Sequence, residues 1–337
     1  MTLAKVLQVR GVPCTVYELE ASPSIRTQGG TLDLKKESGQ RALELANLTK
    51  EFEAIARPEG DAFRIAGKDG RVQFAMEGTD ILDGFEAVEK AEKQRSETEK
   101  SEISQYVPEK NATNTWGDTI RPEVDRGMLR QLFLDSLAPE TIKWGHKLIS
   151  LSTINLPSTY PKHQLKFSNG VAITADVVVG ADGAWSLVRS AISLAQPEYT
   201  GVTMVEVQMS DVDARFPELA KMIGPGSYFG IDNNKALVAQ RNAHSHVRTY
   251  IALRVTEDWT KTSNIPFATD PTETRIRLLE YFQDWVPELK KLVELCDDVI
   301  VPRGIYQLPI APKCTSRSKW EHKQGITVGY FNRLLHI

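Results

Sequence analysis

The chain has 337 residues, enough for about two domains and a sizeable hydrophobic core. Its 41 lysines and arginines are balanced by 44 aspartates and glutamates, so it lacks the basic surplus that nucleic-acid binding requires. No apolar run approaches the roughly 20 residues of a membrane span, and the first residues lack the apolar core of a secretory signal. The three cysteines are too widely spaced for a disulfide framework or a zinc pair, which favours a reducing compartment. We therefore expect a cytoplasmic protein with no nucleic-acid partner, no membrane span and no metal site.

The first elements follow the order helix, strand, acid. Leu3, Val6 and Leu7 have the apolar spacing of a helix, and residues 14–17 are strand-forming residues followed by Glu18. This order is typical of the second half of a βαβ dinucleotide-binding unit, in which an acid binds the adenosine ribose about 20 residues after a glycine-rich loop. That loop would lie before Met1, so we expect a chain that is truncated at its N-terminus.

The next segments alternate turns with short elements. We expect a turn at Gly29–Gly30 followed by a strand, and a hairpin over residues 63–74 around an Asp-Gly turn. Residues 86–110 contain 12 charged residues out of 25, which predicts a solvated helix or a disordered insertion. Asp125 is placed to cap a helix that begins at Arg126.

Residues 172–189 carry the clearest pattern. Residues 173–179 end in three consecutive valines and predict a buried parallel strand, and Gly180–Gly183 would turn the chain into a helix near Ser186. A carboxylate and a glycine at such a turn lie where phosphate and ribose groups bind in doubly wound folds.

The remainder of the chain is richer in strands. We expect strands at residues 202–209, 228–231, 236–240 and 248–255, then helical structure from 272 to 295. The intervening run Gly224–Gly230 resembles a phosphate loop, but Pro225 and the glycine spacing favour a turn.

The run Gly180–Arg189 resembles the G-A-D-G-x-x-S-x-V-R element of the FAD-dependent aromatic-ring hydroxylases, also called class A flavoprotein monooxygenases. Within this family it is most similar to the tetracycline-inactivating branch and its fungal relatives. Further matches follow in the same order: Val16–Glu18, Gly29–Leu34, Ser38–Gln40, Arg126–Arg130, Leu308–Pro309, Trp320 and Gly325–Thr327.

The resemblance implies an α/β fold with two interleaved domains. Residues 1–60, 119–196 and 300–337 would form a FAD-binding domain of the βαβ type found in glutathione reductase. Residues 61–118 and 197–299 would form a substrate domain with a mixed sheet. The family's chemistry belongs to FAD, which NADPH reduces and which uses O2 to hydroxylate an aromatic or polyketide-like small molecule.

The resemblance also implies roles for individual residues. Glu18 would bind the adenosine ribose, Arg26 would meet NADPH, and Asp33 and Arg126 would approach the flavin. Asp182–Gly183 would contact the cofactor and shape the NADPH path. In the substrate domain, the side chains to inspect near the flavin are Glu206, Gln208, Gln240 and Tyr250, and no catalytic nucleophile or base is required.

Ordinary structural roles are the alternatives for these residues. Glu18 could be a solvated strand end, Arg26 a loop cation, Asp33 a turn former and Arg126 an ion-pair partner of a neighbouring acid. The family's late Gly-Asp element is replaced by residues 329–333, so truncation is expected at both ends. The alternative function is therefore a non-catalytic remnant that binds FAD weakly or not at all.

Overall fold

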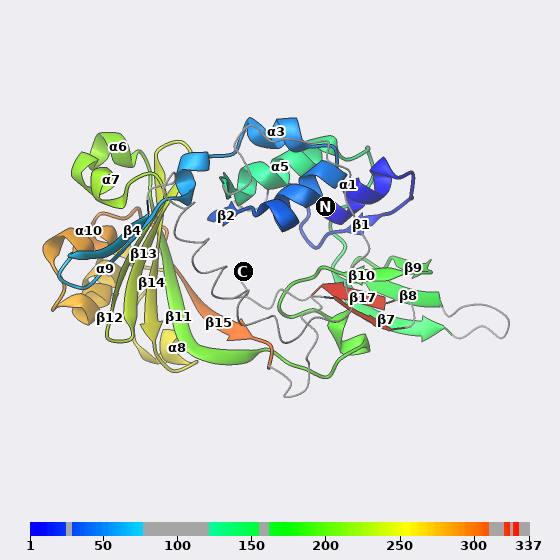
Figure 1. Cartoon of the computed structure of the whole chain (residues 1–337). Coiled ribbons are helices and arrows are strands. Elements are labelled where there is room, and N and C mark those ends of the chain that lie inside the picture. Colours follow the sequence, from blue (N-terminus) through cyan, green and yellow to red (C-terminus); the bar gives the residue numbers. More distant parts are fainter. Residues whose placement is uncertain (25–28, 77–120, 155–161, 310–319, 324–325, 330–337) are drawn as a thin grey trace, which may run out of the picture.

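The computed structural model describes residues 1–24, 29–76, 121–154, 162–309, 320–323 and 326–329. Figure 1 shows a large sheet with helices on its outer face, a group of helices joined to short strand pairs, and a smaller group of β-strands. The charged insertion predicted at residues 86–110 lies outside the described residues.

The large sheet has seven strands, and its only parallel neighbours are β3 and β12. In spatial order the strands are β15 (Val301–Gln307), β11 (Glu198–Met209), β14 (His246–Arg254), β13 (Lys235–Asn242), β12 (Ser227–Asp232), β3 (Phe63–Ala66) and β4 (Val72–Met76). The predicted hairpin and the four predicted later strands are all confirmed within this sheet, and the four later strands alternate buried apolar residues with more exposed ones.

One face of this sheet is packed on helices. Val205, Val207 and Met209 point into a core whose other side comes from α10, through Leu289 and Leu292. The helices of this part are α6 (Val212–Arg215), α7 (Pro217–Ile223), α8 (Trp259–Thr262), α9 (Pro271–Leu279) and α10 (Pro287–Glu294), with the 3-10 turn η4 (Glu280–Phe282). The helical structure predicted over 272–295 is therefore confirmed, with a break before Pro287.

A second core lies among the N-terminal helices and α5. Its largest buried side chains are Leu43, Leu48, Phe52 and Phe133. The helices are α1 (Thr2–Val9), α2 (Arg41–Leu45), α3 (Thr49–Glu53) and α5 (Arg126–Ser136), with the π-turn η1 (Lys36–Gln40) and the 3-10 turn η2 (Pro58–Asp61). The short strand pairs beside them are β1 (Val16–Tyr17) with β6 (Ile142–Lys143), parallel, and β2 (Thr31–Asp33) with β5 (Glu123–Asp125), antiparallel.

The remaining strands form two small sheets. The first is β7 (Leu148–Ile154), β8 (Lys162–Phe167) and β9 (Ala172–Ala175), all antiparallel. The second is β10 (Val178–Gly180), parallel to β17 (Ile326–Gly329), which is antiparallel to β16 (Trp320–Lys323).

The buried parallel strand predicted over residues 173–179 is confirmed only at its end, where β10 is parallel to β17. Asp176 pairs with Lys162 at 3.1 Å between β9 and β10, and of the three valines that follow only Val178 is buried. The helix predicted near Ser186 is reduced to the 3-10 turn η3 (Arg189–Ala191), which follows a turn in which the Asp182 carboxylate accepts the Leu187 and Val188 N–H groups.

The predicted assignment of residues to the two domains differs from the structure for one segment. Residues 301–307, which the sequence analysis assigns to the FAD-binding part, form the edge strand β15 of the seven-stranded sheet. Strand β15 is paired with β11 on both sides of a bulge between Tyr199 and Thr203.

Candidate functional site

The predicted glycine turn lies directly against the large sheet. A Cβ on Gly29 would collide with the Arg248 guanidinium, and a Cβ on Gly30, whose φ is +70°, would lie 2.7 Å from Tyr250 Oη. The Thr31 backbone N–H donates to Gln240 Oε1 at 3.1 Å. Only glycine allows the backbone to approach these side chains so closely, so this turn is the point where the helical part meets the face of the sheet that carries no helices.

Arg126 and Asp33 lie close to this turn. The Arg126 backbone N–H, at the first residue of α5, donates to the Gly30 carbonyl at 3.1 Å. Asp33 is the last residue of β2, which pairs with β5, and it lies opposite Glu123. The structure therefore brings together two of the residues that the resemblance assigns to the flavin, on elements that are distant in sequence.

Glu123 is the residue in this region that the sequence analysis missed. It is 2% exposed, and its Oε2 lies 3.1 Å from the Arg57 guanidinium. Burial, and then the Asp33 charge, raise the pKa of Glu123 from 4.5 to about 8, although Arg57 lowers it. Desolvation also raises the pKa of Asp33, although the Arg121 charge lowers it. The facing carboxyls consequently hold a proton between them at neutral pH.

The other predicted residues lie on separate turns. Glu18 follows β1, and its Oε1 accepts the Glu20 N–H at 3.1 Å. Asp182 follows β10 and accepts the Ser186 hydroxyl at 2.5 Å and the Leu187 N–H at 2.8 Å. Among the described residues, neither carboxylate bonds to Asp33 or Arg126. Their cofactor roles remain predictions.

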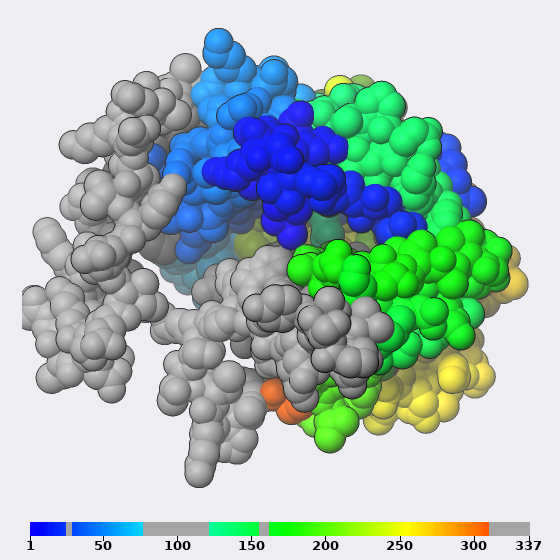
Figure 2. Space-filling model, turned by 90° about the vertical axis from the view of Figure 1, so that its right-hand side faces the viewer, coloured from blue at the N-terminus to red at the C-terminus, as the bar shows by residue number. Residues whose placement is uncertain are grey.

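Gly183 and Arg26 are the two remaining residues that the resemblance assigns to the site. Gly183 has a φ of +82°, and a Cβ added there would meet no atom within 4 Å, so this turn presents bare backbone to open space. Figure 2 shows the surface hollowed between the N-terminal segment in blue and the β7–β10 segment in green. Arg26 lies outside the described residues.

The four side chains singled out in the substrate domain share one face of the large sheet. Glu206 lies opposite Tyr250, and Gln208 lies opposite Arg248, which in turn lies opposite Gln240. Since directly opposed residues point to the same side of a sheet, all of them face away from the covering helices and toward the glycine turn.

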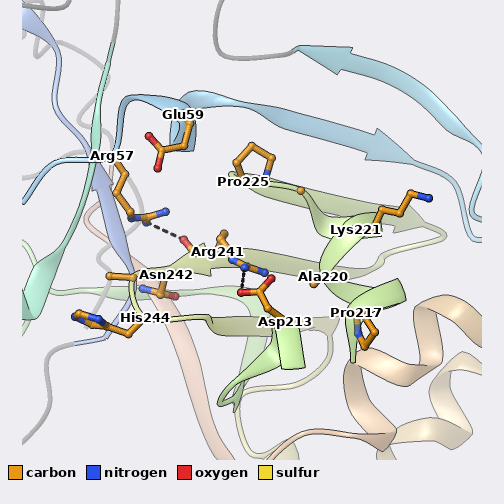
Figure 3. Close-up of a pocket in the computed structure, with 12 residues that line it drawn as sticks. Arg57, Glu59, Asp213, Pro217, Ala220, Lys221, Pro225, Arg241, Asn242 and His244 are labelled. Atoms are coloured by element: carbon orange, nitrogen blue, oxygen red, sulfur yellow. Dashed lines mark hydrogen bonds and ion pairs between the residues drawn. The ribbon is translucent and has the colours of Figure 1, made fainter. Parts of the chain in front are cut away.

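A polar cavity lies beside the same junction, between η2 and the β13–β14 turn (Figure 3). Its volume is about 540 Å³, and its lining includes Arg57, Arg241 and Asp213. Arg57 donates to the Arg241 carbonyl at 2.9 Å, and the Asp125 carboxylate accepts the Ala243 N–H at 3.1 Å. These bonds tie the tip of the β13–β14 hairpin to the start of α5.

The described part of the chain holds no group of three or more metal-binding side chains. None of the helices described is long and apolar enough to cross a membrane.

The chain matches the family model described as "FAD binding domain" over residues 1–284. It is a member of this FAD-binding domain family, and the predicted α/β fold of the family is confirmed. Among solved structures, HpxO of Klebsiella pneumoniae, crystallised with FAD and uric acid, has a TM-score of 0.68 at 15% identity over 97% of this chain and 68% of its own. The tetracycline destructase Tet(51) has a TM-score of 0.56 at 14% identity, over 97% of this chain and 70% of its own.

Two curated relatives are fungal. The chain is 29% identical to "Monooxygenase asqM" of Emericella nidulans over 64% of its length, and 26% identical to "Monooxygenase penA" of Penicillium thymicola over 93%. It spans 56% of the first relative's length and 72% of the second's. The likeness to solved structures carries the fold, and the likeness to these relatives supports the proposal below.

Proposed function

We propose that the protein is an FAD-dependent monooxygenase of the cytoplasm that hydroxylates an aromatic or polyketide-like small molecule. In the balanced reaction, the substrate RH, NADPH, H⁺ and O2 give ROH, NADP⁺ and water. The observation that carries the proposal is the contact of the glycine turn with Arg248, Tyr250 and Gln240, because the turn that accepts the Arg126 N–H and leads to Asp33 lies against these polar side chains of the sheet. The monooxygenase relatives support the same reaction class.

The residues present fit FAD. Gly30 and Gly183 both have positive φ and present backbone without a side chain, and Gly183 has open space around it. Glu18 keeps one carboxylate oxygen outside its bond to Glu20, as a ribose acceptor requires. We assign Glu18 to the ribose, Asp182–Gly183 to contact with the cofactor and to the NADPH path, and Asp33 with Arg126 to the flavin.

FAD, when bound, would accept hydride from NADPH and activate O2. The chain itself would position the substrate and exclude water. Arg126, beside the glycine turn, would place a positive charge next to the flavin, and the partly apolar sheet face would cover the reacting carbon. The described cysteines Cys14 and Cys296 are both unpaired, which suits a reducing cytoplasm.

The test is the visible absorbance spectrum of the purified chain, mixed with excess FAD and then gel-filtered. We expect retained bands at roughly 370 and 450 nm, as in protein-bound oxidised flavins, and NADPH oxidation that a hydroxylated product accounts for. A folded but colourless protein would contradict the proposal and favour the non-catalytic alternative. Circular dichroism of the same sample establishes that the protein is folded.

Asp182→Ala is expected to lower the retained flavin at least several-fold, because the turn that it holds would contact the cofactor. The variant also loses the bonds to Ser186, Leu187 and Val188, which costs about 1 to 2 kcal/mol of stability. Asp135→Ala, on the exposed side of α5, is the control and should retain flavin normally. Equal flavin retention in both variants would remove Asp182 from the site.

A further inference from the structure

Two carboxyl groups face each other across β2 and β5, one buried and one exposed. Asp33 and Glu123 are directly opposed in this antiparallel pair, so their side chains point to the same side. Glu123 is 2% exposed, whereas Asp33 is an exposed residue. A side-chain hydrogen bond joins the two carboxyls. Glu123 thus lies beneath a carboxyl that a ligand can reach.

The surroundings of Glu123 hold it in place. Its backbone N–H donates to the Arg57 carbonyl at 3.1 Å, and the Arg57 N–H donates to the Glu123 carbonyl at 2.7 Å. A Cβ on Gly60 would lie 2.8 Å from Glu123 Oε2, so the backbone of η2 covers this oxygen directly. The Arg57 guanidinium contacts the same oxygen at 3.1 Å and also donates to the Arg241 carbonyl, as Figure 3 shows. A carboxyl that is held this closely can in turn fix the side chain to which it bonds.

The charges around Glu123 decide which of the two facing carboxyls keeps a proton. The other charged groups of this region, from β2, η2, β5 and the residues before η2 and β5, are Asp33, Asp61, Asp125, Arg57 and Arg121. Two arginines are thus shared among four carboxyls, which leaves two negative charges in excess when all four are ionised. The more deeply buried of two facing carboxyls loses more by ionising. The proton therefore stays on Glu123, whose pKa is raised by burial and by the Asp33 charge.

The strand that carries Asp33 is fixed along its backbone. The Thr31 N–H donates to a side chain of the large sheet, and the Leu34 N–H donates to the Pro122 carbonyl at 3.2 Å. Asp33 lies between these two bonds, so its remaining freedom is the rotation of a short side chain. The hydrogen bond from Glu123 restrains that rotation. Because an ionised carboxylate has two acceptor oxygens, Asp33 can still accept a hydrogen bond from a ligand.

We propose that Glu123 is a positioning residue of the cofactor site: its protonated carboxyl donates to the Asp33 carboxylate and fixes the orientation in which Asp33 meets the flavin. The inference rests on the proposed function, because it concerns a residue that is assigned there to the flavin. Glu123 acts through Asp33 and does not itself touch the cofactor. Ionisation of Glu123 would replace this hydrogen bond by repulsion between two carboxylates and would release Asp33 from its orientation.

The experiment measures the affinity of the full chain for FAD by calorimetry at pH 7 and pH 9. The wild type is expected to bind FAD about fivefold more weakly at pH 9, where Glu123 has lost its proton, since one proton changes an affinity by at most about tenfold per pH unit. Glu123→Gln still donates to Asp33 but does not ionise. This variant should match the wild type at pH 7 within about twofold and keep that affinity at pH 9.

Further variants separate positioning from structural support. Glu123→Leu keeps a buried side chain but has no donor, so it should bind FAD at least about fivefold more weakly than Glu123→Gln at pH 7. In an Asp33→Ala background the same replacement should change the affinity by less than about twofold, because the residue through which Glu123 acts is gone. Glu59→Gln removes an exposed carboxyl of η2 and is the matched control, which should keep the wild-type affinity and pH dependence.

The possible results are distinct. An equal response of the wild type and Glu123→Gln to pH, wild-type affinity in Glu123→Leu, or an undiminished effect of that replacement without Asp33 would overturn the positioning role. If Glu123→Leu does not fold by circular dichroism, or Asp33→Ala binds too little FAD to measure, the pH profiles of the wild type and Glu123→Gln decide alone. Flavin binding without these differences removes only the role of Glu123, whereas a folded wild type that binds no FAD at either pH contradicts the proposed function and this role together.

Discussion

Replacing Glu123 by Gln is expected to stabilise the protein at alkaline pH by several kcal/mol. Glu123 is buried opposite Asp33, and the folded state holds its proton up to a pKa of about 8, whereas the unfolded state loses it near 4.5. Between these values the folded protein binds one proton more than the unfolded chain. The free energy of unfolding therefore falls by about 1.4 kcal/mol for each pH unit in that window.

The glutamine variant removes this titration and keeps a neutral side chain that can donate to Asp33. Below pH 4.5 the carboxyl is neutral in both states, so wild type and variant should differ little. Above pH 8 the wild type carries a buried negative charge beside Asp33, and its deficit reaches a plateau on the order of 5 kcal/mol.

Chemical denaturation from pH 5 to pH 9 measures this difference. Glu51→Gln, which removes an exposed carboxyl on α3, is the control and should follow the wild type. A constant difference between wild type and Glu123→Gln across this range would show that the carboxyl is already ionised at neutral pH.

Gly226→Ala is expected to destabilise the protein by at least about 3 kcal/mol, at the upper end of the range for overpacked sites. The new Cβ would collide with the Ala62 carbonyl oxygen and would lie 2.6 Å from the Gly60 carbonyl oxygen. Both obstacles are backbone atoms, which cannot rotate away as a side chain can. The same Ala62 oxygen accepts the Ser227 N–H at 2.9 Å, so relief of the collision would also disturb the parallel pairing of β3 with β12.

Thermal unfolding compares this variant with Gly170→Ala. Gly170 has a φ of +84° and nothing within 4 Å of the added Cβ, so its substitution carries only the backbone cost of about 1 to 2 kcal/mol. Equal losses in the two variants would mean that the strand end moves aside without penalty.

Much of the large sheet could be predicted because its central strands have one covered face. Runs of apolar and strand-forming residues depend only on the local chain, and they located β11 to β14, whereas the Asp-Gly turn located the hairpin of β3 and β4. The run of three valines at 177–179 was misread because a local apolar run does not show how many of its faces the rest of the protein covers. There, only Val178 found a buried position.

The candidate site could be predicted only in part, because some of its residues carry local sequence signals and others depend on contacts that only the fold creates. The Gly29–Gly30 turn and the acid and glycine of the Asp182–Gly183 turn are local signals in the sequence, whereas Asp33 and Arg126 were assigned through the family resemblance. The unusual pKa of Glu123 depends on the β2–β5 register, which no local pattern gives. Arg248 could have been found, because it lies two residues from Tyr250 on the same strand and therefore on the same face.

The bond from the Thr31 N–H to Gln240, beside the contact of Gly30 with Tyr250, has a thermodynamic consequence. A molecule that shifts Gln240 or Tyr250 on the sheet must also disturb the turn assigned to the flavin. By reciprocity, whatever factor the flavin imposes on the affinity for such a molecule, the molecule imposes on the affinity for the flavin. Occupancy of the sheet face thereby reports on occupancy of the cofactor turn.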